Sequence, residues 1–131
     1  MYVSKNHSKF LLKYHVIFST KCRKKLLRGD FDLTLKETMT NISEEYDFTI
    51  DVLETDEDHI HMLINSIPKL SPLTIVRNLK SKSTKQMCKK YPKKMRENYR
   101  KERTLWSDGY FVCSCGDAST ETIKKYIESQ G

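Results

Sequence analysis

Residues 48–65 read FTIDVLETDEDHIHMLIN, and this stretch decides the fold because it contains two strand-like segments around an acidic turn. Phe48–Leu53 alternates apolar and polar side chains, and His59–Asn65 does so again. An alternation with a period of two residues is typical of a β-strand that is buried on one side. The stretch therefore predicts two β-strands, each with one buried and one open face.

The open face of the second segment carries two imidazoles. Side chains alternate along a strand, so His59 and His61 share one face while Ile60 and Met62 share the other. The Cα atoms of alternate strand residues lie about 6–7 Å apart, which lets both rings converge on one metal ion. Packing of the apolar face would hold the strand rigidly, as a metal site requires. Two surface histidines on a half-exposed strand explain the same pattern, and the spacing alone does not decide.

The rest of the chain contains elements of both kinds. We expect a strand at Phe10–Thr20, a helix from Asp30 or Asp32 to about Tyr46, a helix that starts at Pro72, a mobile basic loop or short helix at 90–104, a strand at Tyr110–Cys115 and a helix from Ser119 to Gln130. The order β-α-β-β-α-β-α is close to a split βαβ arrangement. The sequence therefore predicts one α+β domain over residues 1–131. Its ferredoxin-like (RRM-like) antiparallel sheet would have helices packed on one face and the other face left for a ligand.

Helical periodicity predicts which side chains of the two longer helices face the core. These are Leu33, Leu35, Met39 and Ile42 in the first helix, and Leu73, Val76 and Leu79 in the second. Three basic side chains of the second helix are expected to face outward, namely Arg77, Lys80 and Lys85.

Length and composition exclude several classes of protein. The chain has 131 residues, a formal charge of +7 and a hydrophobic content of 37%, which fits one globular domain rather than a disordered or fibrous chain. No apolar run reaches the roughly 18–20 residues of a membrane span. The first residues also lack the apolar region of a secretory signal. We therefore expect a soluble, cytoplasmic protein with no membrane partner.

The charge is divided between two segments. Residues 30–58 contain eleven acidic residues and one lysine, for a net charge of −10, whereas residues 77–103 contain twelve basic and two acidic residues, for a net charge of +10. A basic segment of this size is typical of a binding site for a polyanion such as nucleic acid. Two solvated faces would show the same division.

Candidate phosphate contacts lie in two places. The turn after the first strand supplies Lys21, Arg23 and Lys24, and the basic segment supplies Arg77, Lys80 and Lys85. The cations of the turn are equally consistent with an ordinary solvated loop. Aromatic residues also alternate with the basic ones, as expected where unpaired bases stack on a protein, although several could belong to the core. They are Tyr91, Tyr99, Trp106, Tyr110 and Phe111.

The terminal helix offers a second candidate for chemistry. Tyr126 and Gln130 are one helical turn apart, so both can reach one ligand. A tyrosine is a competent nucleophile if a nearby cation stabilises its phenolate. Packing of Tyr126 between the helix and the sheet explains its position equally well, and spacing does not select it from the seven tyrosines of the chain.

Four stretches, taken in order, resemble one known family. They are His15–Lys24 (HVIFSTKCRK), Asp58–Leu63 (DHIHML), Trp106 with Gly109–Val112 (GYFV), and Glu121–Gln130 (ETIKKYIESQ). Together they resemble the single-tyrosine HUH transposases of IS200-like insertion sequences, where HUH means His-hydrophobic-His. The likeness spans nearly the whole chain, and its strength lies in the agreement of motif, order and spacing.

The resemblance implies specific roles. His59, His61 and Gln130 would hold a divalent ion, Mg²⁺ or Mn²⁺. Tyr126, on a catalytic C-terminal helix, would attack single-stranded DNA and form a 5′-phosphotyrosine link. The resemblance also implies a homodimer in which the tyrosine helix of one subunit can complete the site of the other. The substrates would be DNA hairpins at the ends of an insertion sequence.

Two other functions are compatible with the sequence. A non-enzymatic module that binds single-stranded nucleic acid would explain the basic and aromatic residues without any metal. A domesticated relative would keep the chemistry but act on host repeats.

Overall fold

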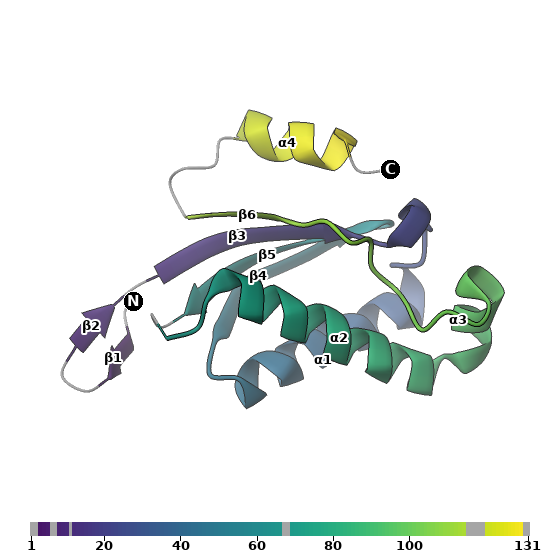
Figure 1. Ribbon diagram of the computed structural model, residues 1–131, viewed down its shortest axis with the longest axis horizontal. Helices are drawn as coiled ribbons and strands as arrows, with labels where there is room; N and C mark the ends of the chain where they lie inside the picture. Colours follow the sequence, from purple (N-terminus) through teal and green to yellow (C-terminus); the bar gives the residue numbers. More distant parts are fainter. Residues whose placement is uncertain (1–2, 6–7, 11, 67–68, 115–119, 130–131) are drawn as a thin grey trace.

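The computed structural model describes residues 3–5, 8–10, 12–66, 69–114 and 120–129, with side chains for 12–66, 69–114 and 125–129. The elements in chain order are β1 (Val3–Lys5), β2 (Ser8–Phe10), β3 (Leu12–Ser19), the 3-10 turn η1 (Lys21–Arg23), α1 (Gly29–Glu45), β4 (Thr49–Asp56), β5 (His59–Ser66), α2 (Pro72–Lys90), α3 (Pro92–Tyr99), β6 (Phe111–Ser114) and α4 (Thr120–Ser129). Figure 1 shows their arrangement around a central sheet.

The central sheet has four strands in the order β4-β5-β3-β6. Each neighbouring pair is antiparallel. The chain runs β3-α1-β4 with β5 lying between the two strands, and then β5-α2-α3-β6 with β3 lying between them. This interleaving is the split βαβ arrangement, so the predicted α+β, ferredoxin-like sheet is confirmed.

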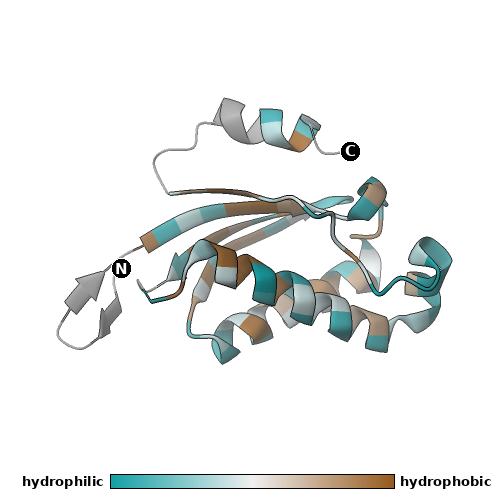
Figure 2. Ribbon diagram, viewed as in Figure 1, coloured by the Kyte–Doolittle hydropathy of each residue, from teal (hydrophilic) through white to brown (hydrophobic). Residues whose placement is uncertain are grey.

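The two faces of the sheet are covered by different helices. α1 and α2 lie on one face, and α4 lies across the other (Figure 1). The face toward α1 and α2 is apolar, and its central side chains are at most 1% exposed: Val16, Phe18, Ile60, Met62 and Ile64. Figure 2 shows apolar residues concentrated along these strands. The face that the sequence left for a ligand is therefore covered in part by α4.

The starts of the two long helices differ in chemistry. Ser71 caps α2, because its Oγ accepts a hydrogen bond from the Thr74 amide at 3.1 Å. α1 instead begins after Arg28, which makes no side-chain cap. The prediction of an aspartate cap was wrong, because Asp32 lies in the first turn, where a carboxylate interacts favourably with the helix dipole. Its Oδ1 accepts a hydrogen bond from Thr55 at 2.7 Å and so links α1 to β4.

Two leucines predicted for the core are exposed. Leu33 is 65% exposed because it lies two residues from both Phe31 and Leu35, on the opposite side of the helix. Leu73 is 42% exposed in the first turn of α2, where Ile75 is buried instead.

The structure gives more detail for two other predicted segments, 90–104 and 10–20. The segment 90–104 contains the short helix α3, whose Met95 and Tyr99 are buried. Within the strand predicted at Phe10–Thr20, Phe10 belongs to β2 and pairs with β1, whereas β3 pairs with β5 and β6 in the central sheet.

Candidate active site

The β4–β5 hairpin positions the two histidines. Its loop is Glu57-Asp58, and the Asp56 carboxylate accepts a hydrogen bond from the Glu57 amide at 2.8 Å, which fixes the turn. His59 and His61 then lie half-buried on one face of β5, while Ile60 and Met62 are fully buried on the other. The alternation that the sequence predicted is therefore present.

Each imidazole contacts a neighbour through one ring nitrogen. His59 Nδ1 lies 3.1 Å from Asp58 Oδ1, and His61 Nε2 lies 3.1 Å from His15 Nδ1. The rings of His15 and His61 stack with centroids 5.4 Å apart. Burial, together with the charge of His15, lowers the pKa of His61, so this imidazole is neutral at neutral pH. A neutral imidazole is the form that ligates a metal.

Asp58 connects the histidine strand to the turn after β3. Arg23 donates to both carboxylate oxygens, from Nε to Oδ2 at 3.0 Å and from Nη2 to Oδ1 at 3.1 Å. Burial opposes ionisation of this carboxyl, but hydrogen bonds from Arg23 and His59 outweigh it and hold the pKa of Asp58 below its ordinary value. Asp58 is therefore an ion-paired carboxylate that also orients His59.

Tyr126 lies on α4, over the same face of the sheet. Its ring packs against Phe111 of β6, with centroids 5.2 Å apart. Phe111 is paired with Ile17 of β3, and Ile17 is paired with His61 of β5, so these side chains form a row across three strands. Ile17 is 1% exposed although it points away from the main core. α4 thus brings the tyrosine to the face that carries the histidines.

The hydroxyl of Tyr126 is buried and has no hydrogen-bond partner among the described residues. Burial raises the pKa of Tyr126 to about 12, so the phenol is protonated at neutral pH. Gln130, the other residue predicted on this helix, lies outside the described residues. No group of three or more His, Cys, Asp or Glu side chains suited to a metal occurs in the described part of the chain.

The structure divides the predicted DNA-binding cations into two sets. Arg77, Lys85 and Lys24 are exposed. Lys21 is paired with Glu102, and Arg23 is paired with Asp58. The Lys80 amine donates to the carbonyls of residues 107, 108 and 109 at 2.8–3.2 Å. The second set therefore makes contacts within the protein.

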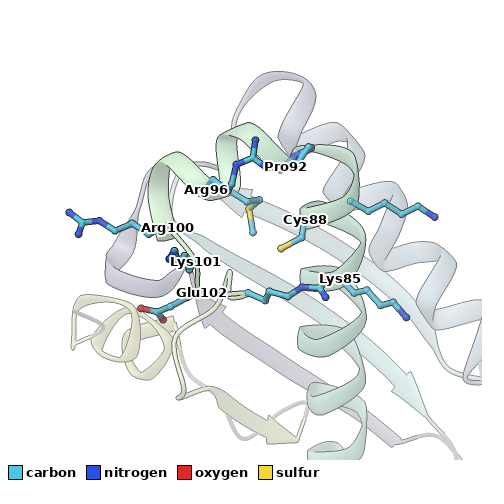
Figure 3. A pocket seen from close by; sticks show the side chains of 10 residues that line it. Lys85, Cys88, Pro92, Arg96, Arg100, Lys101 and Glu102 are labelled. Atoms are coloured by element: carbon cyan, nitrogen blue, oxygen red, sulfur yellow. The ribbon is translucent and has the colours of Figure 1, made fainter.

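Two connected grooves lie along α2. The larger, of about 820 Å³, is bounded by α2, α3 and residues 100–103 (Figure 3). The second, of about 630 Å³, includes Arg77, Lys80 and Trp106. Lys85 and Arg103 line both grooves. The larger groove is lined by six cations: Lys85, Lys89, Arg96, Arg100, Lys101 and Arg103. This basic groove therefore contains much of the charge that the sequence placed at 77–103.

Most of the aromatic residues proposed for base stacking are part of the core. Tyr99 and Trp106 are buried, and Trp106 donates from Nε1 to Ser83 Oγ at 2.9 Å. Tyr91 packs on Phe31. Tyr110 is the most exposed of the five proposed residues, at 37%.

Sequence reasoning missed the partners of the candidate residues. His15 and Asp58 were not assigned a role, and Phe111 was proposed only for base stacking, although each of the three contacts a candidate side chain. The periodicity of β3 shows which face His15 takes, but only the register of β3 against β5 places it beside His61. That register is a long-range property that local patterns do not encode.

The comparisons with known proteins agree with this geometry. Residues 8–130 match the family described as transposase, IS200-like. The chain is 28% identical to the ISDra2 transposase TnpA of Deinococcus radiodurans, over 92% of this chain and 85% of the relative. It is 30% identical to the transposase for insertion sequence element IS200 of Salmonella typhimurium, over 95% of this chain and 80% of the relative. The chain belongs to the IS200-like transposase family.

Solved structures show the same fold. A candidate transposase from Deinococcus radiodurans R1 superimposes with a TM-score of 0.87 at 25% identity, covering 99% of this chain and 98% of that one. A REP-associated tyrosine transposase bound to a REP hairpin gives a TM-score of 0.58 at 11% identity, over 95% and 68% of the two chains.

The family resemblance predicted from the sequence is confirmed, and the protein is an enzyme of DNA transposition. Among the described residues, no helix is long and apolar enough to span a membrane.

Proposed function

We propose that the protein cleaves and rejoins single-stranded DNA through a covalent link to Tyr126, with the help of a divalent metal ion. One observation supports this proposal. Tyr126 lies over the sheet face on which His59 and His61 lie, so the candidate nucleophile and two candidate metal ligands share one surface.

The residues present fit a divalent ion. His59 uses Nδ1 and His61 uses Nε2 for neighbouring side chains, which leaves Nε2 of His59 and Nδ1 of His61 as the ligating atoms. A carboxylate contact like that of Asp58 with His59 commonly orients metal-bound imidazoles in proteins. Gln130 would add a side-chain carbonyl. Two imidazoles suit Mn²⁺ better than Mg²⁺. A bound cation would polarise the phosphate and stabilise the charge that develops on it.

Tyr126 supplies the nucleophile. Its phenol gives up its proton as the oxygen bonds to phosphorus, the bond between phosphorus and the 3′ oxygen breaks, and the 3′ oxygen takes up a proton, so that no proton is gained or lost overall. The products are a 5′-phosphotyrosine and a free 3′-OH. Because the energy of the phosphodiester is retained in the link, a second 3′-OH can displace Tyr126 and rejoin the strands without ATP.

The basic groove along α2 and α3 is the proposed surface for DNA phosphates. Six of its ten lining residues are cations and one, Glu102, is acidic, so its net positive charge suits a polyanion. The REP-associated relative is bound to a hairpin, and we propose that DNA hairpins are also the substrates here. We further propose a cytoplasmic homodimer, in which the tyrosine helix of one subunit can complete the site of the other.

The proposal is tested by trapping the covalent intermediate. Purified protein, Mn²⁺ and a pool of labelled hairpin oligonucleotides are incubated, and the products are run on a denaturing gel. We expect label at the mass of the protein, and none with Tyr126→Phe or without the metal. Tyr46→Phe is the matched control, because Tyr46 directly follows α1 and packs against the apolar core. An undiminished adduct in Tyr126→Phe would contradict the assignment, and tight hairpin binding with no adduct would favour a non-enzymatic module.

A further inference from the structure

One arginine joins the turn after β3 to the tyrosine helix. Arg23 donates from Nη1 to the backbone carbonyl of Ile127 at 2.9 Å, while Nε and Nη2 hold the two oxygens of Asp58. Ile127 follows Tyr126, and Asp58 precedes His59. The same guanidinium thus contacts the residue next to the candidate nucleophile and the residue next to a candidate metal ligand.

We propose that Arg23 is the positioning residue that docks α4 on the sheet and so places Tyr126 for reaction. This inference rests on the proposed role of Tyr126 and deepens it, because it names what holds the nucleophile near the histidines. Arg23 acts through Tyr126 and Asp58 in this proposal, and does not itself contact the reacting phosphate.

The turn that carries Arg23 is held in an unusual backbone conformation. Cys22 has φ 59° and Arg23 has φ 48°, a left-handed region that costs roughly 1–2 kcal/mol for a residue other than glycine. Backbone hydrogen bonds fix this turn, from Lys21 to Leu105 at 2.8 Å and from Arg23 to Thr20 at 3.0 Å. Such strain persists where the surroundings determine the conformation, and it clusters at functional sites. Here the strained turn directs the guanidinium of Arg23 toward Asp58 and Ile127.

α4 needs an external contact of this kind. The helix has ten residues, and isolated helices shorter than about 12–15 residues are marginal in water. Its last carbonyls lack partners within the helix, and its last turn contains no basic residue. A cation at a helix C-terminus is favourable, and Arg23 supplies that cation from another part of the chain. The ring of Tyr126 on Phe111 also joins α4 to the sheet.

The geometry distinguishes this role from phosphate binding. All three guanidinium nitrogens of Arg23 donate to groups of the protein itself. A lysine has one compact ammonium and cannot reproduce a planar fork. We therefore expect Arg23→Lys to behave like Arg23→Ala, although it preserves the charge.

The first test needs no DNA. Hydrogen exchange of the full-length protein is followed by mass spectrometry in Arg23→Ala, Arg23→Lys and the control Arg28→Ala, an exposed arginine in the same region. We expect amides of α4 to exchange roughly tenfold faster in both Arg23 variants, as loss of charge-assisted hydrogen bonds implies. α1 and α2 should exchange as in the wild type, which shows that the fold survives. Unchanged exchange in α4 would overturn the proposal.

The second test separates positioning from DNA binding. At saturating hairpin, adduct formation should slow at least tenfold in both Arg23 variants, while the Kd for the hairpin stays within about twofold. A weaker Kd with a salt slope reduced by about one would instead place Arg23 on a phosphate and overturn the proposal. If the wild-type protein forms no adduct at all, the proposed function fails, whereas the exchange experiment still decides whether Arg23 docks α4.

Discussion

At the scale of single residues, the site contains a buried polar group for which the described part of the chain offers no hydrogen-bond partner. The Tyr126 hydroxyl is buried without a partner among the described residues, and such a group costs about 1–3 kcal/mol. A structural tyrosine would normally find a hydrogen bond for its hydroxyl. The Tyr126 hydroxyl, which the proposed chemistry requires as the nucleophile, therefore lowers the stability of the folded protein.

We predict that Tyr126→Phe is at least as stable as the wild type at pH 7. In the wild type, the pKa of Tyr126 is about 12 in the folded state, against about 10 when unfolded. Because the phenol ionises more easily in the unfolded chain, the free energy of unfolding is unaffected by this group below pH 10. It falls as the pH rises from 10 toward 12. Urea unfolding at pH 7 and pH 11 checks this, because the wild type should lose more stability than Tyr126→Phe. A variant less stable than the wild type by more than 1 kcal/mol at pH 7 would disprove the prediction.

Some positions of the site residues could be predicted from the sequence, and others could not. The shared face of His59 and His61 follows from alternation along one strand, and it was predicted correctly. The contacts of His15 with His61 and of Arg23 with Asp58 join residues 46 and 35 positions apart. Local periodicity carries no information about such pairs, because they depend on strand register.

At the scale of elements, Lys80 fastens α2 to the segment before β6. Its amine donates to three consecutive carbonyls and lies over the rings of Phe18 and Tyr110. Burial lowers the pKa of Lys80. The sequence predicted that this lysine faces outward, because helical phase alone does not show that a later segment crosses over it.

We predict that Lys80→Ala destabilises the protein by about 1.5–3 kcal/mol in the absence of DNA, since carbonyls bonded to a charged donor lose it. Arg77→Ala, at an exposed position of the same helix, should change stability by less than about 0.5 kcal/mol. Chemical unfolding of both variants measures the difference. Equal stabilities would show that the contacts of Lys80 contribute little, and would leave DNA binding as its main role.

At the scale of the whole molecule, the two charged segments take different positions. The basic segment follows α2, α3 and the residues after them, where it lines the grooves. The acidic segment covers α1, β4 and the hairpin turn, and part of it is used within the fold, as in Asp32 with Thr55 and Asp58 with Arg23. Net charge in the sequence was thus a reliable guide to the basic groove, but a poor guide to individual contacts.

We predict that hairpin affinity falls by orders of magnitude between about 50 and 200 mM salt, because several phosphates are neutralised. Lys85→Ala and Arg103→Ala, in the part common to both grooves, should each lower the salt slope by about one. Lys36→Ala is the control, because Lys36 pairs with Asp32 on α1. Fluorescence anisotropy across a salt series measures the slope, and a flat response would exclude the basic groove as the DNA surface.

The two-residue loop between β4 and β5 links the position of the histidines to the packing of the core, because both depend on how the two strands pair. A one-residue shift of β5 against its neighbouring strands would exchange the two faces of β5, since every side chain moves to the opposite side. The histidines would then enter the core while Ile60 and Met62 met solvent. The register of this hairpin therefore decides two things at once: which side chains of β5 fill the core, and which face carries the histidines.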